Sequence, residues 1–76
     1  MTLHEAIVQV LKENGRPMTS REIADMVNDG KLYVRKDGQP VPTSQINARV
    51  NNYFRIFDRV NGKVVLVDAA GDETKK

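Results

Sequence analysis

The sequence predicts a mainly α-helical domain with a small β-hairpin, in which three helices are followed by two C-terminal strands. Three observations predict it: two helix-start signals near the N-terminus, a third helical apolar pattern after Pro42, and an Asn61-Gly62 pair between two apolar runs. We place the domain at residues 1–67. Residues 68–76 show no apolar periodicity, so we expect a disordered tail or the start of a linker there.

The first two helices carry the same signals. Thr2 with Glu5, and Thr19 with Glu22, match the capping box, in which each side chain satisfies a backbone donor. Apolar residues follow each box at helical spacing, and a glycine closes each helix. The "RPM" segment between them is compatible with a single bridge of a small sheet. Two helices joined by so brief a turn predict the beginning of a helix-turn-helix.

The third helix follows a longer connection. Residues 31–42 contain an Asp-Gly turn signal and predict an ordered loop or an irregular hairpin. Thr43 or Ser44 is expected to cap a helix of about residues 44–56. At ~100° per residue its apolar side is formed by Ile46, Val50, Tyr53 and Phe54.

The last element is a hairpin over residues 57–67. Asn-Gly suits a type I′ turn, which needs positive φ at both central residues. The expected pairs are Val60 with Lys63, Arg59 with Val64, and Phe57 with Leu66. One face then carries Phe57, Val64 and Leu66, and the other carries Val60, Val65 and Val67. Both faces are partly apolar, so the pattern does not choose the one that packs inward.

Composition indicates a folded chain with little room for a large pocket. Seventy-six residues make one domain, and a domain this short buries roughly 60% of its unfolded surface. The apolar fraction of 39% and the charged fraction of 29% are typical of globular proteins. The absence of cysteine excludes disulfides and thiolate metal sites. No apolar run approaches the ~18 residues of a membrane span, and the N-terminus is unlike a signal peptide. We therefore expect no membrane partner and an intracellular location, cytoplasmic and nucleoid-associated in a bacterium or nuclear in a eukaryote.

Charge is unevenly distributed along the chain. Residues 1–30 hold three basic and five acidic residues, a net of −2, whereas residues 31–67 hold seven basic and two acidic residues, a net of +5. A basic half joined to an acidic half favours a face made for a polyanion. Uneven scatter in a small protein is the alternative.

Three helices followed by a hairpin is the winged helix-turn-helix order, in which helix 3 lies in the DNA major groove and the wing flanks it. Asn and Gln can pair with adenine and Arg with guanine, whereas cations outside the helix meet phosphates. An ordinary solvated helix face is the alternative. The candidate DNA-binding residues are Lys36, Ser44, Gln45, Asn47, Ala48, Asn51, Asn52, Arg55, Arg59 and Lys63.

Two segments carry a resemblance, "LHEAIVQVLKENGRPMTSREIADMV" and "LYVRKDGQPVPTSQINARVNNYFRIFDRVNGKVVLV", which together cover residues 3–67. They resemble the HARE-HTH family. This winged helix occurs in some restriction endonucleases, in Additional-sex-combs-like chromatin proteins and in the delta subunit of bacterial RNA polymerase. The resemblance implies a DNA-binding or DNA-adjacent adaptor role in restriction-modification or transcription regulation, often beside a catalytic domain. The polymerase member is understood to dock on protein.

Enzyme signatures are incomplete in this sequence. "HEAIV" begins like the zincin H-E-x-x-H, but Val8 stands where the second zinc ligand is needed. We expect His4 to border the apolar stripe of helix 1, and Asp25 and Asp29 to form a solvated acidic face. Phosphate-cradling glycine motifs are absent as well. We therefore expect no catalysis by this chain alone, no metal and no cofactor.

Aromatic residues offer a weaker nucleic-acid signal, since base stacking uses such side chains. Tyr53 shares the apolar side of helix 3 and is expected in the core, with Arg49 packed on it. The role of Tyr33 stays open.

Two other functions remain possible at this stage. The chain could be a protein-interaction adaptor of a DNA-processing or transcription complex, using an apolar patch around Val8 or the acidic surface of helices 1 and 2. That surface is formed by Glu5, Glu13, Glu22, Asp25 and Asp29. RNA binding through the basic half is the third alternative.

Overall fold

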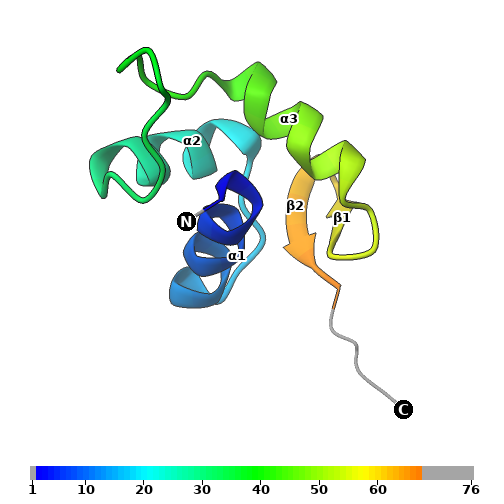
Figure 1. Ribbon diagram of the computed structural model, residues 1–76. Helices are drawn as coiled ribbons and strands as arrows, with labels where there is room; N and C mark the ends of the chain where they lie inside the picture. The colour runs from blue at the N-terminus through cyan, green and yellow to red at the C-terminus, as the bar shows by residue number, and fades with distance from the viewer. Residues whose placement is uncertain (1, 68–76) are drawn as a thin grey trace.

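The computed structural model describes residues 2–67 and contains three helices and one hairpin (Figure 1). The helices are α1 (Leu3–Asn14), α2 (Ser20–Asp29) and α3 (Thr43–Asn52), and the strands are β1 (Phe57–Val60) and β2 (Lys63–Leu66). This is the predicted winged helix-turn-helix order. The prediction for residues 68–76 lies outside the described residues.

Both capping boxes form as predicted. Thr2 and Glu5 exchange hydrogen bonds at the start of α1, and Thr19 and Glu22 do so at the start of α2. Gly15 ends α1 with φ 62°, in the left-handed conformation that glycine adopts without strain.

The hairpin has the predicted register, with Phe57 opposite Leu66 and Val60 opposite Lys63. Asn61 and Gly62 both have positive φ, 53° and 78°, as a type I′ turn requires. The expected bridge also forms. Met18 and Val64 exchange backbone hydrogen bonds of 3.1 and 2.6 Å, so one residue of the α1–α2 turn extends the sheet. We call the β1–β2 hairpin the wing.

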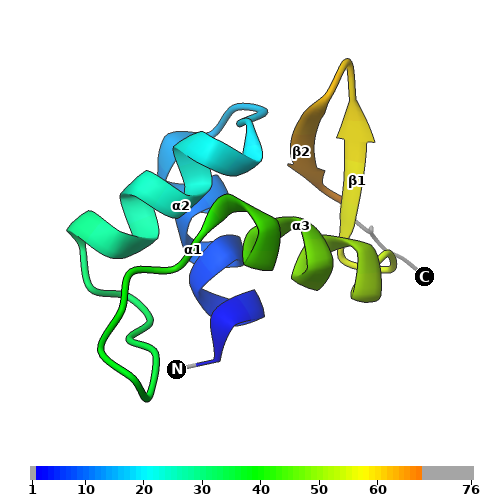
Figure 2. The same cartoon turned by 90° about the horizontal axis from the view of Figure 1, so that it is seen from above.

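The core lies where the three helices meet one face of the wing. Phe57 and Val64 point into it, whereas Val60 on the other face is 49% exposed, which resolves the choice left open by the sequence. In Figure 1, α3 lies above α1, with the start of α2 near its N-terminal end and the wing below its C-terminal end. Figure 2 shows the 31–42 loop and the wing at opposite ends of the molecule. The buried apolar residues are Leu3, Ala6, Ile7, Val10, Leu11, Met18, Ile23, Ala24, Val27, Val41, Ile46, Val50, Phe57 and Val64.

The predicted end of the third helix was wrong. The helix stops at Asn52, and Tyr53 leaves helical geometry with φ −115° and ψ 46°. The Tyr53 carbonyl then accepts hydrogen bonds from the N–H groups of both Ile56 and Phe57, at 2.9 and 3.0 Å. Residues 53–56 therefore form a turn, because Phe57 must already be extended to pair with Leu66. Phe54, predicted on the apolar side, is 70% exposed instead.

The predicted cap of α3 was also wrong. Pro42 occupies the N-cap position, and within residues 2–67 no side chain caps this helix. Its start is fixed from a distance: the Asn28 amide donates to the Val41 carbonyl at 3.0 Å and accepts from the Val41 N–H at 2.8 Å. Val41 is buried, so this pair attaches the end of the loop to α2.

The 31–42 segment is an ordered loop, the first of the two predicted alternatives. Its turn is closed by a 3.0 Å hydrogen bond from the Gly38 N–H to the Arg35 carbonyl, and Gly38 has φ 76°. Gly30 ends α2 in a helical conformation, and the positive φ of 50° falls on Lys31. None of the helices among the described residues has the length and apolar character needed to cross a membrane.

Candidate nucleic-acid interface

The outward side of α3 is built from small and polar side chains. Ser44, Ala48, Asn51 and Asn52 are exposed, whereas Gln45 is half-buried. The opposite side of the helix buries Ile46 and Val50 in the core, which fixes the rotation of α3. A surface of amides and hydroxyls without bulky aliphatic groups lets another molecule approach the helix closely and form hydrogen bonds with it.

Asn47, a predicted base-reading residue, makes contacts inside the protein. Its Oδ1 accepts a hydrogen bond from the Ser20 hydroxyl of α2 and another, 2.9 Å long, from Nη2 of Arg59 in β1. An amide oxygen has two lone pairs, and both are used here. Bidentate pairing with adenine needs this oxygen, so Asn47 in this arrangement positions α2, α3 and the wing relative to one another.

Sequence analysis missed the role of Ser20 at this junction. Ser20 is 7% exposed and is the buried polar residue of the core region described here. Its partner Asn47 lies far away in sequence, and neither residue belongs to a motif that predicts the pair. The only signal was the amide-rich pattern of α3, which does not distinguish an amide that contacts a ligand from one that holds the fold.

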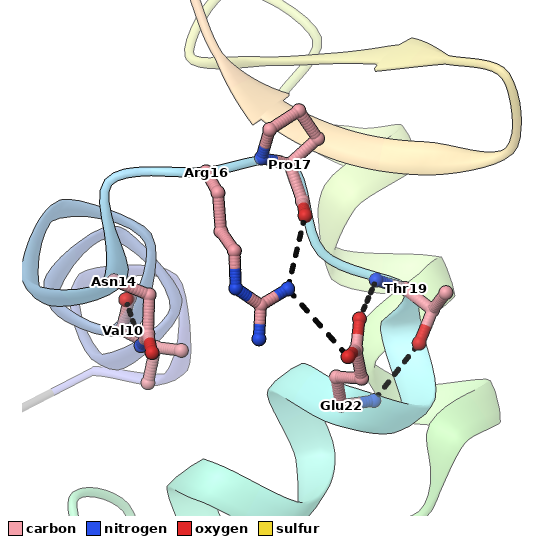
Figure 3. Close-up of polar contacts among 6 residues, drawn as sticks. All are labelled: Val10, Asn14, Arg16, Pro17, Thr19 and Glu22. Atoms are coloured by element: carbon pink, nitrogen blue, oxygen red, sulfur yellow. Dashed lines mark hydrogen bonds and ion pairs between the residues drawn. The ribbon is translucent and has the colours of Figure 1, made fainter.

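The turn that presents Ser20 is held by charged and polar contacts (Figure 3). Glu22 Oε1 accepts from the Thr19 N–H at 2.9 Å, and Thr19 Oγ1 accepts from the Glu22 N–H at 3.1 Å. Arg16 lies 3.6 Å from the Glu22 carboxylate. The Thr19 N–H and then the Arg16 guanidinium lower the pKa of Glu22 below its ordinary value. At the start of α1, hydrogen bonds from the backbone and side chain of Thr2 likewise lower the pKa of Glu5.

The sequence model of one protein family matches this chain over residues 1–69, and its description is HARE-HTH, an HTH domain of ASXL and restriction endonuclease proteins. The chain belongs to the HARE-HTH family. No curated protein and no solved structure matches it significantly. Membership agrees with the observed order of three helices and a wing, and it associates the chain with a family of helix-turn-helix modules.

The cations of this HARE-HTH domain lie around α3 but on different elements. Arg55 is exposed in the turn that follows the helix, whereas Arg59 and Lys63 are exposed on the wing. Lys36 is exposed in the loop, at the opposite end of the molecule (Figure 2). Arg59 is the one whose guanidinium is fixed by α3, through Asn47. The remaining candidate cations project from a turn, a strand end and a loop.

Tyr53 and Arg49 pack against the body of this HARE-HTH domain. The Tyr53 ring stacks on His4 of α1, with ring centroids 4.3 Å apart and an angle of 18° between planes. The Arg49 guanidinium carbon lies 6.0 Å from the centroid of the same ring. Tyr53 also packs on the core. Its predicted core position and its contact with Arg49 are therefore confirmed, and these three side chains join α1 to the end of α3.

Acidic groups lie apart from this surface. Asp25 and Asp29 are exposed on α2, as predicted. Within residues 2–67, no three His, Asp or Glu side chains gather as a metal site would require.

Proposed function

We propose that this HARE-HTH domain binds double-stranded DNA, with α3 in the major groove and the wing on the sugar–phosphate backbone. The observation that carries the proposal is the exposed side of α3, where Ser44, Ala48 and Asn51 present a small and polar surface next to the basic wing. A solvated face without this function would not require cations at both ends of the helix.

Base contacts are assigned to exposed groups of α3 and the following turn. Asn51 has both its amide oxygen and its amide nitrogen available for an adenine edge, and Arg55 can contact guanine. Ala48 permits close approach of the helix to the groove. Ser44, Gln45 and Asn52 contribute hydrogen-bonding groups at the borders of the same surface.

Phosphate contacts are assigned to the residues around the helix. Arg59 and Lys63 on the wing and Lys36 in the loop lie on either side of α3. Charge neutralisation by such groups makes binding strongly dependent on salt. The Asn47 contact holds the Arg59 guanidinium in place before DNA arrives, so less conformational entropy is lost on binding.

The test is a fluorescence-anisotropy titration with a random-sequence duplex and with selected sites, at several salt concentrations. Arg55→Ala and Asn51→Ala should each weaken binding to a selected site by about 5- to 100-fold, since a bidentate base contact contributes about 1–3 kcal/mol. Lys12→Ala removes the same charge from the exposed surface of α1 and serves as the control for Arg55→Ala. Unchanged affinity in both α3 variants would exclude the proposed docking.

Protein interaction is the second candidate, and the exposed acidic side chains Glu13, Asp25 and Asp29 favour it. In this alternative the domain directs a transcription or restriction-modification complex, or an attached catalytic domain, through α1 and α2. Asp25→Lys with Asp29→Lys is the suitable variant, because Glu22 is needed for a helix cap. If this double variant releases a co-purifying partner and binds DNA as the wild type does, the acidic surface is the partner site.

A further inference from the structure

Phe54 is the most exposed large apolar side chain among residues 2–67, at 70%, compared with 63% for Val34 and 49% for Val60. The backbone explains this position. The helix ends at Asn52, and the Tyr53 ring is held against the body of the domain by its stack on His4. The next residue therefore turns outward, at the junction of α3 and the wing.

A hollow lies between the Phe54 ring and the wing. Phe57 and Val50 are buried and supply an apolar floor. The lining residues are Val50, Asn51, Phe54, Phe57, Asp58 and Arg59. A second hollow, lined by residues 52–56, lies against the same ring, so Phe54 stands between two open spaces. An aromatic wall beside an open space suits a flat ligand that stacks.

The edge of the first hollow is polar and carries both signs of charge. Asp58 Oδ1 accepts from the Arg59 backbone N–H at 2.7 Å. Asp58 Oδ2 accepts no hydrogen bond from residues 2–67 and remains available at the edge. Asn51 adds an exposed amide, while Arg55 and Arg59 flank the hollow. A purely apolar ligand would leave these groups without partners.

We propose that this hollow binds an unpaired nucleobase of DNA, stacked on Phe54, with its flanking phosphates against Arg55 and Arg59. This inference rests on the proposed function and adds a preferred DNA structure to it. Stacking on an aromatic ring tolerates every base. The Asp58 carboxylate accepts from an exocyclic amino group. The site therefore favours cytosine, adenine and guanine over thymine, which lacks that group.

A paired duplex cannot fill this hollow, because its bases lie inside the stack. Extruding a base costs a few kcal/mol, and the cost is smallest when the base is already unpaired. The domain should therefore prefer a duplex with a single-base bulge to the same duplex fully paired. The charge arrangement supports this ligand, since each phosphate beside an extruded base has a cation within the same surface.

The experiment compares three ligands by fluorescence anisotropy at low salt: a paired duplex, the duplex with one bulged cytosine, and the duplex with one bulged thymine. The wild type should bind the cytosine bulge about 5- to 100-fold more tightly than the paired duplex, the range that base–aromatic stacking spans. Phe54→Leu keeps an apolar side chain and removes the ring, so this preference should disappear while paired-duplex affinity stays. Val34→Ala, which shortens an exposed apolar side chain in the loop, is the matched control and should change neither. Asp58→Ala should equalise the two bulges.

The outcomes separate the two proposals. If the paired duplex binds with the expected salt dependence but the bulge is not preferred, the base site is excluded and the proposed function stands. A preference that survives in Phe54→Leu also excludes the site. If none of the three duplexes binds at low salt, both proposals are excluded. Phe54 is exposed, so loss of folding does not confound its variant.

Discussion

The two halves of this domain reach their structures by different means. In residues 2–30 the helices begin at capping boxes and α1 ends at a left-handed glycine, so short segments determine their own limits. In residues 31–67, α3 begins where Asn28 holds Val41 and ends where Phe57 enters a strand. The half that we propose to meet DNA is therefore shaped mainly by contacts with distant residues. Local signals cannot be used to judge how firmly it is held.

The largest expected effect separates two aromatic residues that are neighbours in the sequence. Phe57→Ala should lower the free energy of unfolding by about 3–5 kcal/mol, because it leaves a cavity between the wing and the helices. Phe54→Ala should change it by less than about 0.5 kcal/mol, since that side chain is in solvent. Urea unfolding followed by circular dichroism measures both. Equal effects would mean that Phe54 contributes to the core.

The next effect tests whether α3 depends on α2 for its start. Asn28→Ala removes both hydrogen bonds to Val41 and leaves a buried N–H and carbonyl without these partners. Unsatisfied groups of this kind cost about 1–3 kcal/mol each, so we expect a loss of about 2 kcal/mol or more and weaker DNA binding. Asn51→Ala on the exposed side of α3 is the control and should leave unfolding unchanged. Hydrogen exchange at the first turn of α3 should accelerate only in Asn28→Ala.

A smaller effect compares two threonines at helix starts. Thr19→Ala removes a side-chain cap and should cost about 1 kcal/mol. Thr43→Ala should have little effect, because within residues 2–67 no side-chain cap hydrogen bond is recorded for α3. Thermal unfolding of the two variants under identical conditions measures the difference. A cost as large for Thr43→Ala would show that α3 has a cap of its own in solution.

The smallest effect concerns pH and belongs to the first half. The pKa values of Glu5 and Glu22 are lower in the folded protein than their ordinary value of 4.5, chiefly through backbone N–H donors. The resulting stabilisation is present above pH 4.5 and is lost as pH falls through the folded pKa values. Glu22→Gln should flatten the acid side of the stability–pH profile. An unchanged profile would mean that its cap adds no pH dependence. Glu13→Gln, which alters an exposed carboxylate outside a cap, is the control.

Much of the fold could be predicted because its signals are local. The capping boxes, the Asn-Gly turn and the strand register each depend on residues a few positions apart. The end of α3 could not be predicted in the same way, since helical periodicity continues through Phe54 while the pairing of Phe57 with Leu66 stops the helix earlier.

The same distinction applies to the candidate site. Helical periodicity alone predicts that Ser44, Ala48 and Asn51 lie opposite the core, and they are exposed as expected. The use of Asn47 by Ser20 and Arg59 could not be predicted, because it joins three elements whose relative placement is tertiary. The exposure of Phe54 depends on the same early helix end. DNA contact by these residues stays a prediction.

The bridge between Met18 and Val64 bears on how the chain folds. An isolated two-stranded hairpin is at best marginally stable in water. Here the wing gains its third strand residue only when the turn between the first two helices is already in place. Closing so long a loop is slow compared with forming a helix. We therefore expect the wing to complete late in folding, so that a partly folded chain would lack its basic arm and would not engage DNA prematurely.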